Sequence, residues 1–223
     1  MGTRGAVGFH KDGVDKITYN HFDSYPSGLG HDVITFIQDT PTDELNEIFD
    51  RIVLVKDTYP EGSVIATTVD ITAGTQPTPE QIAEVKDILE GRKNDVGDIV
   101  GSMKVSTGQD EEWYCLLRDA QGDLDAYRQG LRYMIDNVGF MRDSLFNEWS
   151  YILNLDTEKL EVYRGFNTQG PQEGNRYEIN QPYEEFYAVR LLATFSFDKI
   201  RDMNADDLVV RIESLAEKQS AEA

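Results

Sequence analysis

The sequence has very little cysteine and no long apolar run. Cys115 is the only cysteine among 223 residues, which excludes an intramolecular disulfide and a zinc site built from several cysteines. Its neighbours in EWYCLLRD are largely apolar, so we expect a buried small side chain. No apolar stretch approaches the ~20 residues that a membrane span needs, and the first residues do not resemble a signal peptide. We therefore expect a cytoplasmic protein without membrane association.

Basic residues are scarce relative to acidic ones. Lys and Arg total 21 against 41 Asp and Glu, which gives a formal net charge of −20. Binding to a phosphate backbone requires Lys and Arg to displace condensed counterions, so we expect no nucleic-acid binding through a basic surface. Arg190, Arg201 and Arg211 are interpreted as lying among acids. The acidity favours solubility, or alternatively an acidic surface that docks on a basic partner or imitates a nucleic acid.

Nucleotide-binding and metal-binding sequence motifs are missing as well. No P-loop, dinucleotide fingerprint, HExxH helix or EF-hand loop occurs, so the sequence predicts no cofactor. The apolar fraction of 39% is nevertheless ordinary for a globular protein. A chain of this length can bury roughly 70% of the surface that its unfolded form exposes. We expect one compact domain over residues 1–223, with a possible subdomain boundary near 92–112, where the chain is polar and rich in glycine.

Short runs rich in β-branched and aromatic residues predict two hairpins. Strands near 4–10 and 14–22 are joined by Asp-Gly, and runs 149–155 and 160–166 form the second hairpin. Glycines 5 and 8 within the first strand indicate a neighbouring backbone at close range, or a bulge. Further strands are predicted within 62–74, 112–120 and 186–197.

Helix start signals and helical spacing predict the remaining elements. Capping residues are expected at Ser27, Thr40, Thr78 and Asn204, and apolar spacing predicts a helix over 124–138. The last residues, EKQSAEA, are expected to fray. Strands at both ends with helices between them indicate an α+β fold, in which an antiparallel or mixed sheet built from the two hairpins is covered by several α-helices.

The stretch YNHFDSYPSGLG, residues 19–30, is the most distinctive segment of the chain. It follows the second strand directly, and Pro26 and Gly28 indicate a tight turn before a helix. A strand end, a turn and a helix start can aim loop side chains and free backbone N–H groups at one point. This stretch is therefore the leading candidate for a site.

The three histidines all lie near this stretch, and two have acids beside them. His10 precedes the stretch, His21 lies within it and His31 follows it directly. Asp23 lies close to His21, and Asp32 is next to His31. Imidazole and carboxylate together suit zinc, manganese or iron, so one hypothesis is a metal-binding protein that uses His21, Asp23 and His31. Surface or hydrogen-bonded histidines are the competing interpretation, and no residue is assigned as a metal ligand.

A second hypothesis is an amide hydrolase with an N-terminal nucleophile. In such enzymes a Thr, Ser or Cys begins the first strand of a hairpin and its own α-amine acts as the base. Thr3 opens such a strand here, although removal of Met1 would expose Gly2. The candidate catalytic residues are then Thr3, Asn20, His21 and Asp23, and the candidate binding residues are Arg4, Tyr25 and Ser27.

The N-terminal GTRG and YNHFDSYPSGLG, taken with the late EWSYILNLDTEKLEVYRGFN, resemble a group of uncharacterised phage and bacterial proteins. These proteins start with a TRG-like strand and carry a YNHFDSYP-like or HWDGYP-like turn. The resemblance covers the segment through Gly30 and the late hairpin. It implies no activity, but it implies a phage-type setting, in the host cytoplasm for a phage-encoded protein. The residues that the resemblance marks as the shared motif are Asn20, His21, Asp23, Tyr25 and Pro26.

The sequence as a whole favours an acidic accessory protein that acts by binding a partner protein, such as a host protein in a phage setting. Whether the chain is an enzyme stays open at this point. The stretch 19–30 also has an architectural interpretation. In that interpretation His21 hydrogen-bonds across the turn, Asp23 caps backbone N–H groups and Tyr25 packs on the following helix.

Overall fold

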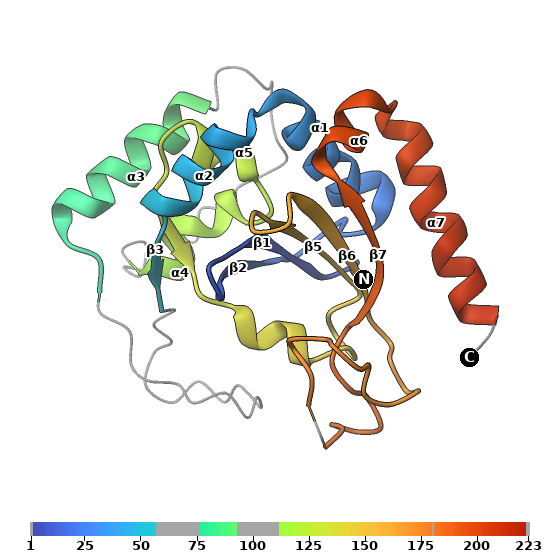
Figure 1. Ribbon diagram of the computed structural model, residues 1–223. Helices are drawn as coiled ribbons and strands as arrows, with labels where there is room; N and C mark the ends of the chain where they lie inside the picture. Colours follow the sequence, from blue (N-terminus) through green and yellow to red (C-terminus); the bar gives the residue numbers. More distant parts are fainter. Residues whose placement is uncertain (1, 57–75, 93–111, 180, 222–223) are drawn as a thin grey trace.

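The computed structural model describes residues 2–56, 76–92, 112–179 and 181–221 (Figure 1). Most of the predicted boundary at 92–112 and the strand predicted within 62–74 lie outside these described residues. Within them, none of the helices combines the length and the apolar character that spanning a bilayer requires.

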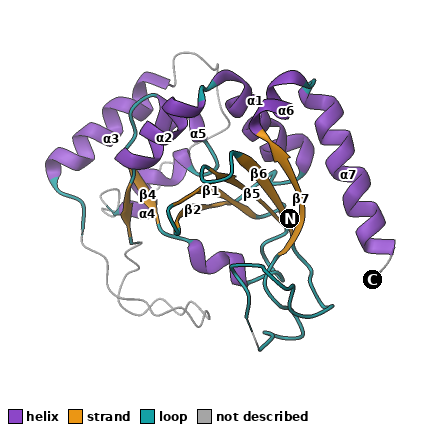
Figure 2. Cartoon of the chain, in the orientation of Figure 1, coloured by secondary structure: helices purple, strands orange, loops and turns teal. Residues whose placement is uncertain are grey.

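The centre of the fold is a mixed five-stranded sheet in the order β2-β1-β5-β6-β7 (Figure 2). The parallel pairing of β1 with β5 joins the two predicted hairpins, and the other neighbouring strands are antiparallel. The predicted α+β fold is thus confirmed. The strands are β1 (Gly5–Lys11), β2 (Val14–Asn20), β5 (Trp149–Asn154), β6 (Lys159–Arg164) and β7 (Arg190–Ser196).

Helices and short turns surround this sheet. A second, two-stranded parallel sheet pairs β3 (Val53–Val55) with β4 (Tyr133–Ile135). The helices of the described residues are α1 (His31–Asp39), α2 (Thr42–Arg51), α3 (Pro79–Arg92), α4 (Trp113–Leu117), α5 (Leu124–Arg128), α6 (Phe197–Asp202) and α7 (Ala205–Ala221). Short helical turns occupy Pro26–Gly30, Arg118–Ala120 and Val138–Arg142.

Each face of the main sheet has its own core because successive side chains on a strand point to opposite sides. Phe9 and Tyr151 belong to the larger core, which the helices cover, as Figure 1 shows for α1, α6 and α7. Ile152 and Tyr163 belong to the smaller core, which is covered by the Val138–Arg142 turn and by the loop between β6 and β7. The sheet is therefore buried on both faces.

A polar network lies at the edge of the smaller core. Asp15 Oδ1 is 2.9 Å from His10 Nδ1 and accepts a 2.9 Å hydrogen bond from the Tyr177 hydroxyl. The Arg176 guanidinium lies 2.7 Å from Glu161 Oε2, which anchors the β6–β7 loop to the sheet. His10 is thus held by carboxylates on the opposite face from the core that the helices cover.

Local capping signals predicted two helix starts correctly. The Thr78 N–H donates to Gln81 Oε1 at 2.8 Å and the Gln81 N–H donates back to Thr78 Oγ1 at 3.3 Å, a complete capping box. Asn204 Oδ1 accepts from the amides of Asp206 and Asp207 at the start of α7. Both caps satisfy backbone donors that have no partner inside the helix.

Other local predictions were wrong. Residues 113–120 are helical, and this turns Cys115 outward so that it is exposed. The helix predicted over 124–138 ends at Arg128, because the chain turns at Gly130, with φ at +111°, and then enters β4. Thr40 follows the end of α1 and caps no helix. The fraying expected over 217–223 stays a prediction, because α7 includes residues 217–221 and residues 222 and 223 lie outside the described residues. The sequence prediction also missed α6, which Ser196 caps.

Gly8 confirms the predicted close approach of a neighbouring backbone. A Cβ atom at this position would lie 2.1 Å from the Lys16 carbonyl oxygen and 2.7 Å from the Ile17 Cα atom. Since backbone atoms cannot move aside cheaply, we expect Gly8→Ala to lower the free energy of unfolding by about 1–3 kcal/mol in denaturant titrations.

Val14→Ala, at an exposed position of the same hairpin, is the matched control and should change the free energy of unfolding by less than about 0.5 kcal/mol. Equal stability of the two variants would contradict the close approach.

Candidate functional site

The stretch 19–30 connects β2 to α1 through a sharp change of chain direction. Residues 20–30 are here called the corner. The chain leaves β2 at Asn20, passes Asp23 with φ at +54°, and enters the short helical turn that begins at Pro26. The Leu29 N–H donates to the Asp23 carbonyl at 2.8 Å, which closes the turn directly before α1. The predicted succession of strand end, tight turn and helix start is present.

Ser24 holds the corner against the sheet. It is fully buried, and each of its polar groups has a partner. Its N–H donates to the Thr3 carbonyl at 3.1 Å, its Oγ accepts from Asn20 Nδ2 at 2.8 Å, and its carbonyl accepts from the Tyr151 hydroxyl at 3.1 Å. We call these four residues the Ser24 network. Because buried polar groups are costly to leave unpaired, the network fixes the position of the corner.

Asn20 has an architectural role in these contacts. Its Nδ2 group donates to the Phe22 carbonyl as well as to Ser24. A Cβ atom at Gly122 would lie 2.4 Å from Asn20 Oδ1, so the loop before α5 packs directly against this side chain. Asn20, predicted as a candidate catalytic residue, therefore uses its amide donors within the corner.

His21 is half-buried and makes its hydrogen bond along β2, not across the turn. Its Nδ1 atom lies 2.7 Å from the Tyr19 hydroxyl, and its ring packs edge-on against Phe22. Burial lowers the pKa of His21 below its usual value, and the positive charges of Arg4 and Arg118 lower it further. The imidazole is accordingly kept neutral at pH 7.

The structure does not join the predicted catalytic residues to one another. Within the described residues, no hydrogen bond or ion pair links the Thr3 side chain, His21 and Asp23. Thr3 contacts Ser24 through its carbonyl, and the Arg4 guanidinium lies over the Phe146 ring at 5.5 Å.

Metal ligation was the other chemical hypothesis for these side chains. Across residues 2–56, 76–92, 112–179 and 181–221, no group of three or more His, Cys, Asp and Glu residues is placed to hold a metal ion. His31 instead has Asp206 at 3.7 Å from its Nε2 atom and Asp32 at 3.9 Å from its Nδ1 atom. His21 and His31 therefore have separate neighbours.

A hollow of about 530 Å³ opens beside the corner, between α1 and the start of α5. Among the residues that the structure describes, its wall includes no Lys or Arg, and exposed Phe22 and Tyr25 lie on the side of the corner. We call it the acidic hollow because its wall contains five aspartates, namely Asp23, Asp32, Asp39, Asp123 and Asp125.

Sequence reasoning identified only part of this wall. Asp32 and Asp39 lie seven residues apart on α1, a spacing that places them on one helix face and could have been noticed. Asp123 and Asp125 come from a distant segment, for which no local signal exists. The acidic surface was expected, but its location at the corner was not.

The carboxylates of the acidic hollow influence one another. The pKa of Asp32 is raised mainly because burial removes part of its surrounding water. The charge of His31 lowers this pKa, and the negative charge of Asp125 raises it further. The Asp32 side chain is still 78% exposed, so the shift is modest. Asp125 has a partner in Arg128 at 2.7 Å, one helical turn along α5. Negative charge therefore predominates in the hollow.

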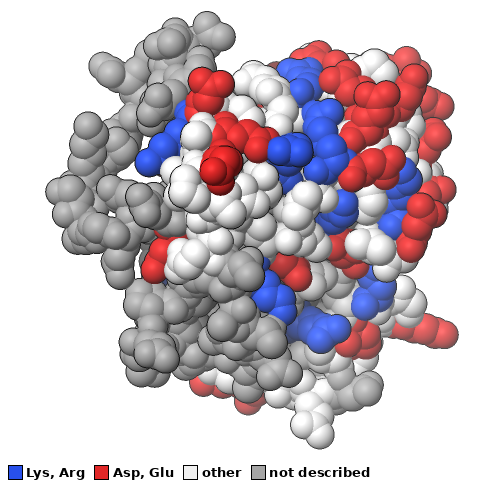
Figure 3. Space-filling view, turned by 90° about the vertical axis from the view of Figure 1, so that its left-hand side faces the viewer, with Lys and Arg blue, Asp and Glu red and all other residues white. Residues whose placement is uncertain are grey.

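On the face of the molecule drawn in Figure 3, acidic side chains lie at several places, with Lys and Arg side chains between them. Comparison with protein-family models, with curated proteins and with solved structures gave no match for this chain.

Removal of the Asn20 amide tests the Ser24 network. Asn20→Ala leaves the Ser24 hydroxyl and the Phe22 carbonyl without their donor, so we expect the free energy of unfolding to fall by about 1–3 kcal/mol. Ser27→Ala, at an exposed position of the same corner, should change it by less than about 0.5 kcal/mol. Chemical denaturation of both variants measures the difference, and an unchanged Asn20→Ala protein would refute the network.

The titration of His21 tests the electrostatics of the corner. An NMR pH titration should give a pKa below 6.5, and Arg4→Gln should raise it while Arg4→Lys should not. Because the folded-state pKa is lowered, the unfolded chain binds the proton more readily, and stability should decline as the pH falls below 6.5. A His21 pKa at or above 6.5 would be inconsistent with this environment.

Proposed function

We propose that this chain is an acidic accessory protein that binds a basic segment of a partner protein in the acidic hollow. The observation that carries the proposal is the composition of the wall, to which the described residues contribute five aspartates and no Lys or Arg. A hollow lined by charge of one sign focuses the field and concentrates oppositely charged side chains. The formal net charge of −20 strengthens attraction over longer distances.

Two aromatic side chains give the same hollow apolar contact area. Phe22 is 57% exposed and Tyr25 is 39% exposed, although both belong to a corner that is otherwise well packed. Exposed aromatic residues beside a cavity are typical of binding surfaces, where they supply large contact areas. Their ring faces also attract the Lys and Arg side chains that the carboxylates would draw in.

The Ser24 network supports binding because it holds these groups in place before a partner arrives. Ser24 is fixed to Thr3, Asn20 and Tyr151, and the exposed Phe22, Asp23 and Tyr25 immediately flank it. A surface that is already ordered loses less conformational entropy on binding. The buried members of the motif thus position the exposed members.

The setting that we propose for this function rests on a sequence resemblance. The resemblance of the corner to phage and bacterial proteins supports a phage-type protein that meets a host protein in the cytoplasm. Binding is favoured over the hydrolase centred on Thr3, because Asn20 and Ser24 use their polar groups within the corner. The hydrolase and the metal-binding hypotheses stay predictions of the sequence.

Neutralising two carboxylates of the hollow tests the proposal. Asp32→Asn with Asp39→Asn should weaken binding of a short lysine-rich peptide on the order of 10-fold at low salt, because two attractive charges are lost. Fluorescence anisotropy of the labelled peptide measures the affinity, and raised ionic strength should reduce the difference.

The matched control removes the same charge elsewhere. Glu47→Gln with Glu217→Gln changes two exposed positions outside the hollow and should weaken peptide binding by less than roughly twofold. Equal losses in the two double variants would show that the peptide responds to net charge alone, and the proposed site would be wrong.

A further inference from the structure

Two arginines face each other at the end of the sheet away from the β1–β2 turn. Arg164 on β6 and Arg190 on β7 are directly paired in the sheet register, so their side chains share one face. Like charges opposite each other on neighbouring strands destabilise a sheet. In a chain with so few basic residues, this pairing requires a physical reason.

Neither arginine forms an ion pair with another of the described residues. Among the described residues no ion pair within 4.0 Å involves Arg164 or Arg190. The Arg190 Nε atom is buried and has no hydrogen-bond partner in the described part of the chain. A buried donor without a partner destabilises the folded protein. The pair therefore has unused hydrogen-bonding capacity.

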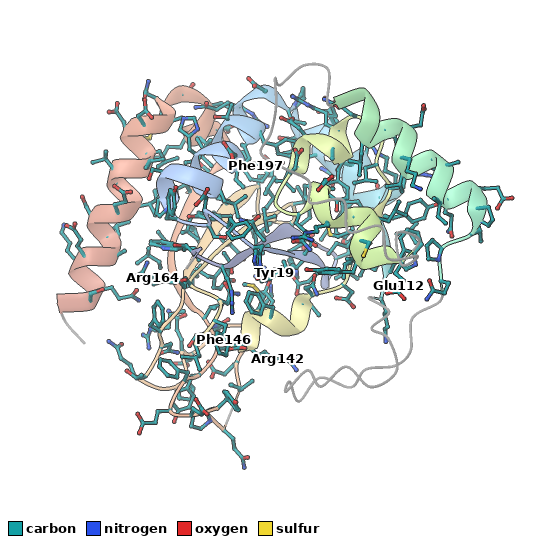
Figure 4. The ribbon with its side chains drawn as sticks, turned by 180° about the vertical axis from the view of Figure 1, so that it is seen from behind. Tyr19, Glu112, Arg142, Phe146, Arg164 and Phe197 are labelled. Atoms are coloured by element: carbon teal, nitrogen blue, oxygen red, sulfur yellow. The ribbon has the colours of Figure 1, made fainter. Side chains whose placement is uncertain are left out.

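The surroundings of Arg164 hold its guanidinium in place. It lies over the Trp149 ring at 4.4 Å, at the end of the sheet near α7 (Figure 4). Burial lowers the pKa of Arg164, and the charge of Glu148 partly offsets this. Stacking on an aromatic face leaves the edge of a guanidinium available for a second partner.

The two arginines line a small cavity of about 90 Å³, here called the arginine pocket. Among the described residues, no carboxylate contributes to its wall. Neutral groups complete the wall, and several can donate hydrogen bonds. Besides the arginines, the lining residues are Gly165, Phe166, Asn167, Thr168, Gln169, Gln219 and Ser220.

The wall on the β6–β7 loop is held rigidly. Asn167 is buried, and its Nδ2 group donates to the carbonyls of Gly170 and Ala188 at 3.0 and 2.9 Å. Its N–H donates to Ser144 Oγ at 3.0 Å, and its Oδ1 accepts from Gln169 at 3.2 Å. These bonds fix the loop that places Thr168 and Gln169 at the pocket.

We propose that the arginine pocket binds a phosphate group. Two guanidiniums present parallel N–H donors that match the oxygens of phosphate, and such charge-assisted hydrogen bonds are stronger than neutral ones. A bound phosphate would satisfy the Arg190 Nε atom and neutralise the repulsion between Arg164 and Arg190. The small volume suits the phosphate itself, with the remainder of a larger ligand outside the pocket.

None of the described residues lines both the arginine pocket and the acidic hollow. The hollow would attract a cation and the pocket an anion. The phosphate proposal therefore stands independently of the proposed partner binding, and either one can fail without the other.

Inorganic phosphate is the first probe. Titration of the full chain, at an ionic strength held constant with sodium chloride, should raise Tm in a saturable manner with a Kd on the order of millimolar. Arg164→Gln and Arg190→Gln should each abolish the phosphate-dependent shift in Tm. Arg142→Gln should retain it, because Arg142 is exposed, lies outside the pocket and is well separated from α7 (Figure 4).

A comparison of two phosphate-containing ligands identifies the source of the phosphate. A conservative variant of Arg190 distinguishes loss of binding from loss of folding. Tighter binding of AMP than of O-phosphoserine would assign a nucleotide, and the reverse order would assign a phosphorylated side chain. Arg190→Lys keeps the charge without the planar fork and should weaken phosphate binding without abolishing it. A wild-type Tm that responds to phosphate no more than to chloride would overturn the proposal and leave the arginines as partners of the last turn of α7.

Discussion

The burial of Ser24 with all its polar groups satisfied is the constraint on which the corner depends. Its amide, hydroxyl and carbonyl bind Thr3 before β1, Asn20 at the end of β2 and Tyr151 in the middle of β5. One small residue thereby joins the chain before β1 to two strands and the entry to α1. Its exposed neighbours, Phe22, Asp23 and Tyr25, are positioned as a consequence. Their ability to bind a partner follows from architecture that they do not themselves provide.

The register of the main sheet places both candidate sites at the same end of its strands, one site at each edge of the sheet. Asn20, Gly5, Trp149, Arg164 and Arg190 are successive neighbours across the five strands. The row begins at the corner with the acidic hollow and ends at the arginine pocket. A protein with a formal net charge of −20 thus carries a site for cations and a pocket for an anion on opposite edges of one sheet.

Much of the fold could be predicted because its signals are local. Asp-Gly between two strands, the capping box at Thr78 and the cap at Asn204 act through neighbours in the chain. Residues 113–120 could not be predicted this way, since a short apolar run suits a buried helix as well as a strand. The corner was likewise predictable. Its acidic hollow was not, because Asp123 and Asp125 reach it through tertiary packing.

Native-state hydrogen exchange at the corner tests the Ser24 constraint most directly. The amides of Ser24 and Leu29 donate to Thr3 and Asp23 inside a corner that is anchored to the sheet. We expect both amides to exchange only when the whole protein unfolds, with the same free energy as the central strands. Exchange of these two amides at rates near those of an unstructured peptide would contradict the account, because the corner would then be a mobile loop.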